Sequence, residues 1–282
     1  MRPSCSKAEI KRARRKPTES LDAYDFFLRG MAREVADLAG GLEQPTSEGT
    51  SEALKLFYAA IELDPEFASA RGSGSLVLCA TQGIWLDERP GARDRGGRKA
   101  RSRCSTSRVK DDAVALATGG YVLAFVVHEL EAGVAAIERA LMLNPNFAAA
   151  WLFLGWTKVW RCQFEVAIEH LERAMRLSPL GRGIAGMQAA VATAHFFAGR
   201  YHEASAWAGR LLREYPASHP GCASPLRAMR PPEKAEEARK AAARLLRVDP
   251  AFRVSKLKNS LGPYPPQAVS KYEEAMRAAG LE

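Results

Sequence analysis

Histidine and cysteine are the residue types in this 282-residue sequence best suited to bind a metal ion or to act as nucleophiles. Four histidines, His128, His170, His195 and His202, lie in its central part, and five cysteines are scattered along the chain. A zinc site needs several such ligands at short, regular spacing. The histidines have no acidic or thiol partner at that spacing, and the cysteines form no CxxC pair. We therefore expect solvated or hydrogen-bonded helix histidines and no metal site.

Other catalytic motifs are missing from the sequence as well. GGRK, at residues 96–99, lacks both the spacing and the strand–loop–helix context of a phosphate-binding loop. No pair of a nucleophile and a base can be picked out, and the chain offers no convincing strand. The sequence predicts a protein that is not an enzyme, with no catalytic residue and no cofactor.

The net charge of +9 is confined to two tracts. Residues 1–16, which include the run KRARRK, carry a net charge of +6, and residues 89–110 carry +8, so the rest of the chain has a net charge of −5. A phosphate-binding surface needs basic side chains on an ordered face, often interleaved with aromatic ones. We therefore expect no nucleic-acid partner, and residues 1–20 are predicted to be a basic, disordered linker.

The cysteine pattern and the hydropathy of the chain predict a cytoplasmic location. An odd number of dispersed cysteines is typical of reduced thiols rather than of a disulfide framework. The N-terminus has positive charge but lacks the apolar centre of a signal peptide. No apolar run is long enough to cross a bilayer, so we expect no membrane association.

Five prolines divide an otherwise helical apolar pattern: Pro65, Pro145, Pro179, Pro216 and Pro250. The second and third are as far apart as the fourth and fifth, at about 34 residues, which is the period of tetratricopeptide repeats (TPRs). The interval between these two pairs is slightly longer, with three additional residues around GRGIAG. The interval between the first two prolines equals two such periods plus an insertion of a dozen positions. The residue before a proline is disfavoured in the α region, so each proline should end a helix.

The side chains between these prolines resemble the TPR signature. The unit that ends at Pro179 carries it almost completely, at Trp151, Leu154, Gly155, Phe164, Ala167, Leu171 and Ala174, with Lys158 in place of the usual aromatic residue. Other units keep parts of it in phase, at Ala53, Phe57 and Ala60, at Ile137 and Ala140, and at Gly199, Tyr201 and Ala204. In such a unit neither of two antiparallel helices can bury its apolar stripe alone. Small residues allow the helices to approach, and the large residues fill the space between them.

Several longer segments resemble a particular group of repeat proteins. KAEIKRARRKPTESLDAYDFFLRGMA, ALKLFYAAIELDPEFASA, KDDAVALATGGYVLAF, AAWLFLGWTKVW and RVSKLKNSLGPY are similar to the C-terminal repeat region of bacterial class III adenylate/guanylate cyclase multidomain proteins. In those proteins a cyclase domain precedes the repeats. This sequence contains nothing similar to the cyclase core, so the resemblance transfers no catalytic residue.

Two stretches depart from the repeat, at residues 87–110 and 217–234. The first is rich in arginine and glycine, and the second contains four prolines where a helix is expected. The pattern resumes in register after each of them. They are either divergent loops or the result of compensating frameshifts in GC-rich coding DNA, and the sequence leaves both alternatives open.

Together these patterns predict an all-α, right-handed TPR solenoid of about five to six antiparallel helix pairs. The expected organisation is a linker over residues 1–20, a repeat array over 21–250 that is irregular at 87–110 and 217–234, and a C-terminal capping segment over 251–282. The capping segment should contain a short helix around Pro266 to Ala279.

The resemblance to TPR proteins also implies a binding surface, because the first helix of each pair lines the concave face in that family. Transferring its groove positions through Gly120 and Gly155 selects Tyr121, Phe125, Leu152, Trp156, Trp160, Phe196 and Phe197. Such a stripe either binds a protein or peptide segment, or is buried between repeats or under the C-terminal segment. The expected function is that of a noncatalytic scaffold that binds a protein partner or a neighbouring domain through this face. The alternative is a C-terminal regulatory fragment of an adenylate/guanylate cyclase, whose partner is a cyclase-containing protein.

Overall fold

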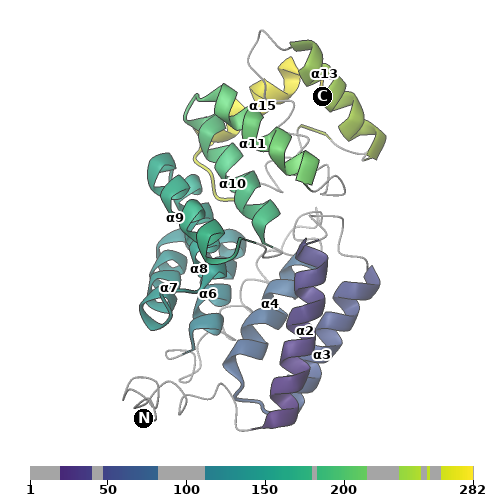
Figure 1. Ribbon diagram of the computed structural model, residues 1–282, viewed down its shortest axis with the longest axis vertical. Coiled ribbons are helices and arrows are strands. Elements are labelled where there is room, and N and C mark those ends of the chain that lie inside the picture. The colour runs from purple at the N-terminus through teal and green to yellow at the C-terminus, as the bar shows by residue number, and fades with distance from the viewer. Residues whose placement is uncertain are drawn as a thin grey trace, which may run out of the picture.

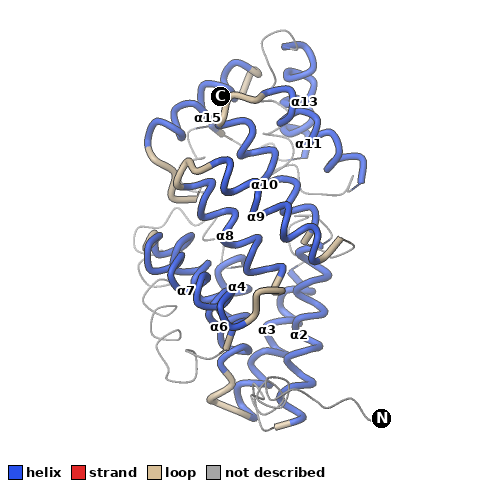
Figure 2. The backbone as a smooth tube through the Cα atoms, turned by 60° about the vertical axis from the view of Figure 1, so that its left-hand side comes forward, coloured by secondary structure: helices blue, strands red, loops and turns tan. Residues whose placement is uncertain are grey.

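The computed structural model describes residues 20–39, 47–81, 112–179, 183–214, 235–248, 253–254 and 262–281, and every regular element in these ranges is helical (Figures 1 and 2). The elements are α2 (Leu21–Ala39), α3 (Ser47–Leu63), α4 (Ala68–Thr81), α6 (Ala113–Val122), the π-helical turn η2 (Leu123–Val127), α7 (Leu130–Leu143), α8 (Ala148–Trp160), α9 (Phe164–Leu177), α10 (Ile184–Phe197), α11 (Tyr201–Glu214), α13 (Ala235–Val248) and α15 (Pro266–Ala278). The all-α prediction is therefore confirmed, and the predicted C-terminal helix is α15.

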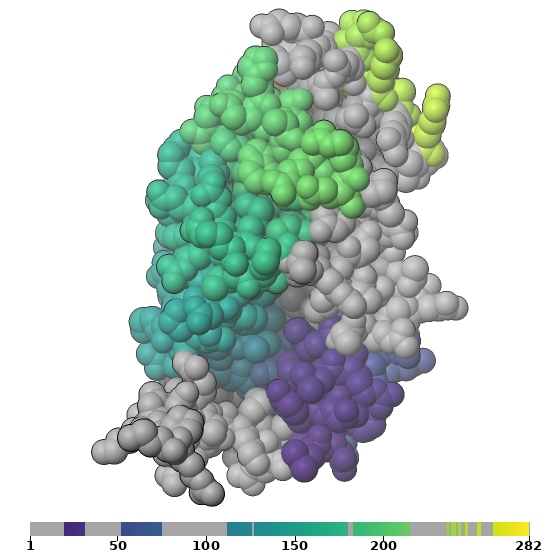
Figure 3. Space-filling view, viewed as in Figure 1, coloured from purple at the N-terminus to yellow at the C-terminus, as the bar shows by residue number. Residues whose placement is uncertain are grey.

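The helices pack in pairs of sequence neighbours. Four pairs are described, α2 with α3, α6 with α7, α8 with α9 and α10 with α11. They follow one another along the long axis of the molecule, so that the colour in the space-filling view changes from the N-terminal helices at one end to the C-terminal ones at the other (Figures 1 and 3). The first helices of successive units also contact each other, α4 with α6, α6 with α8 and α8 with α10. We call these four helices the first-helix layer.

Parts of the predicted organisation lie outside the described residues. These are nearly all of the proposed linker, at residues 1–19, and both irregular stretches, at 87–110 and 217–234. The boundaries assigned to the linker, the array and the capping segment therefore remain predictions.

The five prolines coincide with the ends of second helices. α3, α7, α9, α11 and α13 each end two residues before one of them. Two of the following turns have the same hydrogen bonds: the amides of Phe67 and Phe147 donate to the carbonyls of Asp64 and Asn144, at 3.0 and 3.2 Å. The side chains of Asp64 and Asn144 accept from the amide two residues on, at 2.9 and 3.2 Å. The repeated proline thus marks a repeated turn that leads from one unit into the next.

Small residues hold the helices of a pair close together. In the pair of α6 and α7, a Cβ atom built on Gly120 would lie 2.7 Å from the carbonyl oxygen of Gly133, and one on Gly133 would lie 2.5 Å from that of Gly120. In the next pair, a Cβ atom on Gly155 would lie 2.6 Å from the fully buried side chain of Leu171. The expected division into small residues at the crossing and large residues around it is therefore confirmed in these two pairs.

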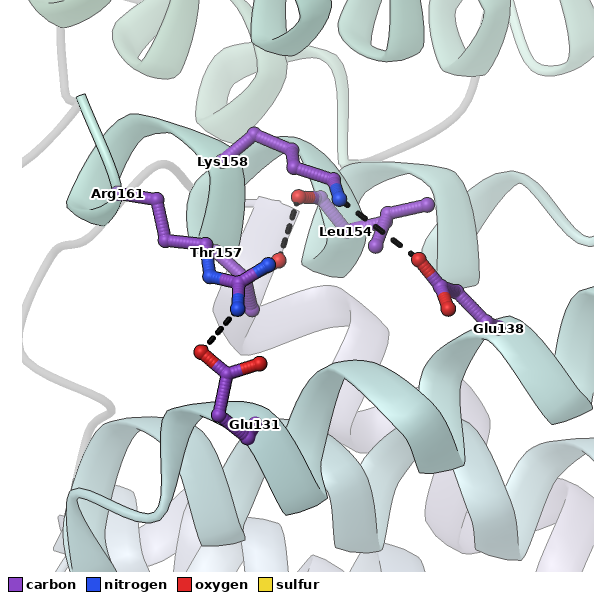
Figure 4. A network of polar contacts seen from close by, with 6 residues as sticks. All are labelled: Glu131, Glu138, Leu154, Thr157, Lys158 and Arg161. Carbon is purple, nitrogen blue, oxygen red and sulfur yellow. Dashed lines mark hydrogen bonds and ion pairs between the residues drawn. The ribbon is translucent and has the colours of Figure 1, made fainter. Parts of the chain in front are cut away.

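Ion pairs join one unit to the next. Glu131, in the first turn of α7, contacts the guanidinium of Arg161 at the end of α8, and Glu138 lies 3.7 Å from the ammonium of Lys158 (Figure 4). One period further along, Glu165 in the first turn of α9 lies 2.8 Å from Arg200, which precedes α11. The units therefore repeat an acidic residue at the start of the second helix, paired with an arginine from the turn of the following unit.

Candidate functional site

A row of aromatic side chains runs along the first-helix layer from α6 to α8. We call it the aromatic row, and it consists of Tyr121, Phe125, Phe153, Trp156 and Trp160. The ring centroid of Tyr121 lies 5.9 Å from that of Phe125, 4.5 Å from that of Phe153 and 5.7 Å from that of Trp160. Trp160 lies in turn 5.5 Å from Phe125 and 6.2 Å from Trp156. These distances are those of stacked and tilted aromatic pairs, so the five rings form one continuous cluster.

The backbone of η2 sets the position of Phe125. This π-helical turn continues α6, and it ends at His128, which adopts a left-handed conformation with φ of 62°. The ring of Phe125, within this turn, is almost parallel to that of Tyr121 in the preceding helix α6, with an interplanar angle of 6°. π-helical turns inside α-helices are frequent at functional sites.

Phe153 belongs to this cluster although it was not among the residues predicted from the sequence. It lies three residues before Trp156 and seven before Trp160, so all three share one face of α8. This spacing could have identified Phe153 from the sequence. The prediction instead transferred individual groove positions from TPR proteins and so left Phe153 out.

The seven predicted site residues differ in exposure. Tyr121, Phe125, Leu152 and Trp156 are half-buried, whereas Trp160, Phe196 and Phe197 are buried, with exposed fractions of 3%, 2% and 8%. Leu152 packs towards the start of α10, and Trp156 packs against both the α9 and the α10 side of the core. The predicted stripe is therefore partly a surface and partly the interior of the stack.

Phe196 and Phe197 are buried by residues near the C-terminus of the chain. The ring of Tyr264 lies 5.1 Å from Phe197, and the ring of Tyr272 lies 6.2 and 6.1 Å from Phe196 and Phe197. One of the alternatives drawn from the sequence, burial under the C-terminal segment, thus describes this end of the stripe.

The pKa values of two histidines of the array, His170 and His195, are lowered from their ordinary value. Burial lowers the pKa of His195, and the nearby Arg200 guanidinium lowers that pKa further. Arg200 donates from its Nε to His195 Nδ1 at 2.9 Å, which requires an unprotonated Nδ1. Burial likewise lowers the pKa of His170, with a smaller contribution from Lys158. These histidines therefore act in packing and hydrogen bonding.

Few groups in the described part of the chain have the arrangement that metal binding or nucleophilic chemistry needs. Among the residues that the structure describes, no group of three or more His, Cys, Asp or Glu side chains is placed to hold a metal ion. Burial raises the pKa of the Cys162 thiol, which reduces its thiolate fraction and hence its nucleophilicity. A cavity in the described part of the chain lies away from the aromatic row, between α3 and α4, and is lined by Leu54, Phe57, Tyr58, Ile61, Arg71 and Gly74.

Paired helices, a regular repeat period and close small-residue crossings define the fold of tetratricopeptide repeat proteins, and comparison with solved structures shows the same fold. The chain is similar to PilW, a type IV pilus biogenesis factor, with 16% identity and a TM-score of 0.56 over 85% of this chain and 98% of that one. It is also similar to a TPR protein of Parabacteroides merdae, with 10% identity and a TM-score of 0.50 over 92% of this chain and 100% of that one. A third similar structure is TTC0263, a TPR protein of Thermus thermophilus, with 15% identity and a TM-score of 0.50 over 79% and 99%.

Comparisons at the level of sequence add no closer relative. No protein-family model matches the chain, and no curated protein matches it. The resemblance to the repeat region of nucleotide cyclases thus receives no support from these comparisons. Within the described ranges, no helix has the length and apolar character required to cross a bilayer.

Proposed function

We propose that the protein is a noncatalytic TPR scaffold that binds a protein or peptide segment through its first-helix layer. The observation that carries this proposal is the aromatic row, in which Tyr121, Phe125 and Trp156 stay half-buried although each is a large apolar side chain. Tryptophan and tyrosine are enriched among the residues that contribute most to binding energy at protein interfaces. Leu152 adds an aliphatic side chain beside Trp156 on α8.

The proposed ligand is an extended or helical segment with apolar side chains. The aromatic row supplies ring faces, which bind apolar and aromatic side chains. The dispersed cysteines favour a cytoplasmic scaffold, and the basic tracts at residues 1–16 and 89–110 lie outside the segments that carry this row. We therefore place protein, rather than nucleic acid or membrane, as the partner.

A peptide-display selection on the immobilised full chain tests this function. Apolar peptides that are selected should bind the Trp156→Ala and Tyr121→Ala variants at least tenfold more weakly than the wild type. Met142→Ala is the matched control, because Met142 is a large apolar residue that is 66% exposed on the second helix α7. The proposal would be overturned if the selected peptides bound Trp156→Ala and Tyr121→Ala with the same affinity as the Met142→Ala control.

A cyclase-containing partner is the second candidate function. The segments that carry the cyclase resemblance, above all KDDAVALATGGYVLAF and AAWLFLGWTKVW, favour it and include Tyr121, Phe125 and Trp156. The test is to look for a cyclase reading frame in the adjacent DNA and to measure that cyclase with and without this chain. An unchanged rate and no binding would reject this candidate and leave the general scaffold function in place.

A further inference from the structure

The C-terminal segment, which we define as residues 262–281, lies on the first-helix layer at the ends of α8 and α10. Several of its residues, Met276 among them, belong to one buried core with residues of α10, α11 and α13. Four residues of the segment, Gly262, Tyr264, Lys271 and Tyr272, contact the ends of α8 and α10. The residues that they touch include Trp160, Phe196 and Phe197, three of the seven that the sequence predicts on the binding face.

Gly262 lies directly against the indole of Trp160. A Cβ atom built on Gly262 would come within 3.0 Å of three atoms of that ring system, which include Nε1 and Cε2. Trp160 is itself buried, so the indole has little room to move away. Only glycine lets the backbone approach the ring this closely.

The chain then turns away from Trp160 and brings an aromatic ring onto α10. The amide of Tyr264 donates to the carbonyl of Gly262 at 2.7 Å, which forms a tight turn around Pro263. Pro265 is extended, with φ of −62° and ψ of 151°, and α15 begins at Pro266. This rigid connection places the ring of Tyr264 5.1 Å from Phe197.

Lys271 holds α15 to the end of α10 by its charge. Its ammonium donates to the carbonyl oxygens of Phe197 and Phe196 at 3.0 and 3.5 Å. The carbonyl of Phe196 also accepts from the amide of Gly199, at 3.0 Å. The carbonyls at the C-terminal end of a helix carry partial negative charge, so a cation is stabilised there. The same ammonium lies 5.5 Å from the ring of Phe196 and 5.6 Å from that of Tyr201, where cation–π attraction adds to the contact.

These contacts are of three kinds that a peptide ligand also makes with a protein surface. Gly262 lies against the indole of Trp160, the ring of Tyr264 packs on that of Phe197, and the ammonium of Lys271 binds the C-terminal end of α10. We propose that the C-terminal segment competes with a protein partner for the surface at the ends of α8 and α10, and that a partner with the same three features displaces it. This inference rests on the proposed scaffold function and specifies the chemistry of the partner. The partner segment carries glycine before a proline and an aromatic residue, followed by a helix with lysine or arginine on its bound face.

Two variants of the full chain should release the segment without altering α8 or α10. Gly262→Val places a branched side chain against the indole of Trp160, and Lys271→Met keeps an apolar stem but removes the charge. Lys240→Met is the matched control, because Lys240 on α13 forms an exposed pair with Glu236, at 2.8 Å. The probe is a fluorescently labelled synthetic peptide of residues 262–281, and its binding to each variant is measured by fluorescence polarisation.

The wild type and Lys240→Met should bind the peptide weakly, because their own segment occupies the site, whereas Gly262→Val and Lys271→Met should bind it at least tenfold more tightly. Equal affinity for all four chains, or no binding to folded release variants, would overturn the proposal. Circular dichroism shows whether the variants are folded.

A second measurement on the wild type does not depend on the variants. Hydrogen exchange of residues 262–281 should accelerate severalfold when a peptide selected on the aromatic row is added, while the amides of α10 stay protected. If such peptides bind but exchange of the segment is unchanged, the competitor role is wrong and the scaffold function stands. If the selection yields no ligand of the aromatic row, the scaffold function itself fails, and the competitor role fails with it.

Discussion

Cys162 and Gly199 occupy the same position in successive units, and both have left-handed backbone, with φ of 58° and 78°. Each lies in the turn between the two helices of its pair. The next residue donates its amide back to the first helix in both turns, Gln163 to Lys158 and Arg200 to His195, each at 2.9 Å. This conformation is easy for glycine and costs about 1–2 kcal/mol for a residue with a Cβ atom.

Cys162→Gly should therefore stabilise the protein by up to about 1 kcal/mol, since the relief of strain exceeds the added freedom of glycine in the unfolded chain. Gly199→Ala should have the opposite effect and cost about 1–2 kcal/mol. Urea denaturation followed by circular dichroism measures both. A Cys162→Gly variant less stable than the wild type would show that the thiol contributes more than the strain removes.

The start of α6 supports a second prediction, on helix capping. Asp112 accepts hydrogen bonds from the amides of Val114 and Ala115 at 2.9 and 3.1 Å, and Ser69 of α4 donates to its other carboxylate oxygen. Asp112→Ala removes the cap and the link to α4 and should cost about 1–2 kcal/mol. Asp25→Ala, which removes an exposed i,i+4 pair with Arg29, is the control and should cost less than about 0.5 kcal/mol. Equal effects in thermal unfolding would argue against the capping role.

The proline spacing explains why so much of the array could be predicted. A proline determines where a helix must end, whatever the distant residues are, and five of the helices end two residues before such a proline. The binding face could be predicted only in part, because burial of Phe196 and Phe197 depends on Tyr264 and Tyr272, which are more than sixty residues away in sequence. Local periodicity carries no information on such a contact.

The histidines support a prediction on pH. The pKa of His195 and that of His170 are lowered below 6.5 in the folded protein, mainly by burial, so the unfolded chain binds more protons just below that pH. The free energy of unfolding should therefore decrease as the pH is lowered through 6.5 towards the folded pKa values. The double variant His195→Asn, His170→Asn should lose this dependence, since asparagine can still accept from Arg200 but does not titrate.

The carboxylates act in a separate pH window. Hydrogen bonds from its own backbone and from Arg200 hold the pKa of Glu165 below 4.5, and those from Gln188 and Arg210 do the same for Glu214. Their stabilisation is present above pH 4.5 and is lost as the pH falls below it, in wild type and double variant alike. If the free energy of unfolding of the double variant depended on pH as steeply as that of the wild type between pH 6.5 and pH 5, His195 and His170 would not be the cause of the dependence.

Gln188 supports a prediction on buried polarity. Its side chain in α10 is fully buried, and Nε2 donates to Glu214 at 2.6 Å, while Oε1 has no hydrogen-bond partner in the described part of the chain. A buried acceptor without a partner costs about 1–3 kcal/mol, and methionine has a similar volume and no such requirement. Gln188→Met should therefore leave stability unchanged or raise it by up to about 1 kcal/mol in urea denaturation. A loss of more than about 1 kcal/mol would mean that the bond to Glu214 outweighs the unsatisfied oxygen.

Two of the three tryptophans of α8, Trp156 and Trp160, allow a packing role to be distinguished from a binding role. Trp160 is 3% exposed and in contact with Tyr121, Phe125 and Gly262, so Trp160→Ala should cost about 3–5 kcal/mol. Trp156 is half-buried, and Trp156→Ala should cost roughly 1–3 kcal/mol, in proportion to the smaller apolar area that it removes from water. Urea denaturation of both variants measures the difference, and peptide binding is then compared under conditions where both are folded. A loss for Trp156→Ala as large as that for Trp160→Ala, with ligand affinity unchanged, would reject a binding role for this ring and leave only packing.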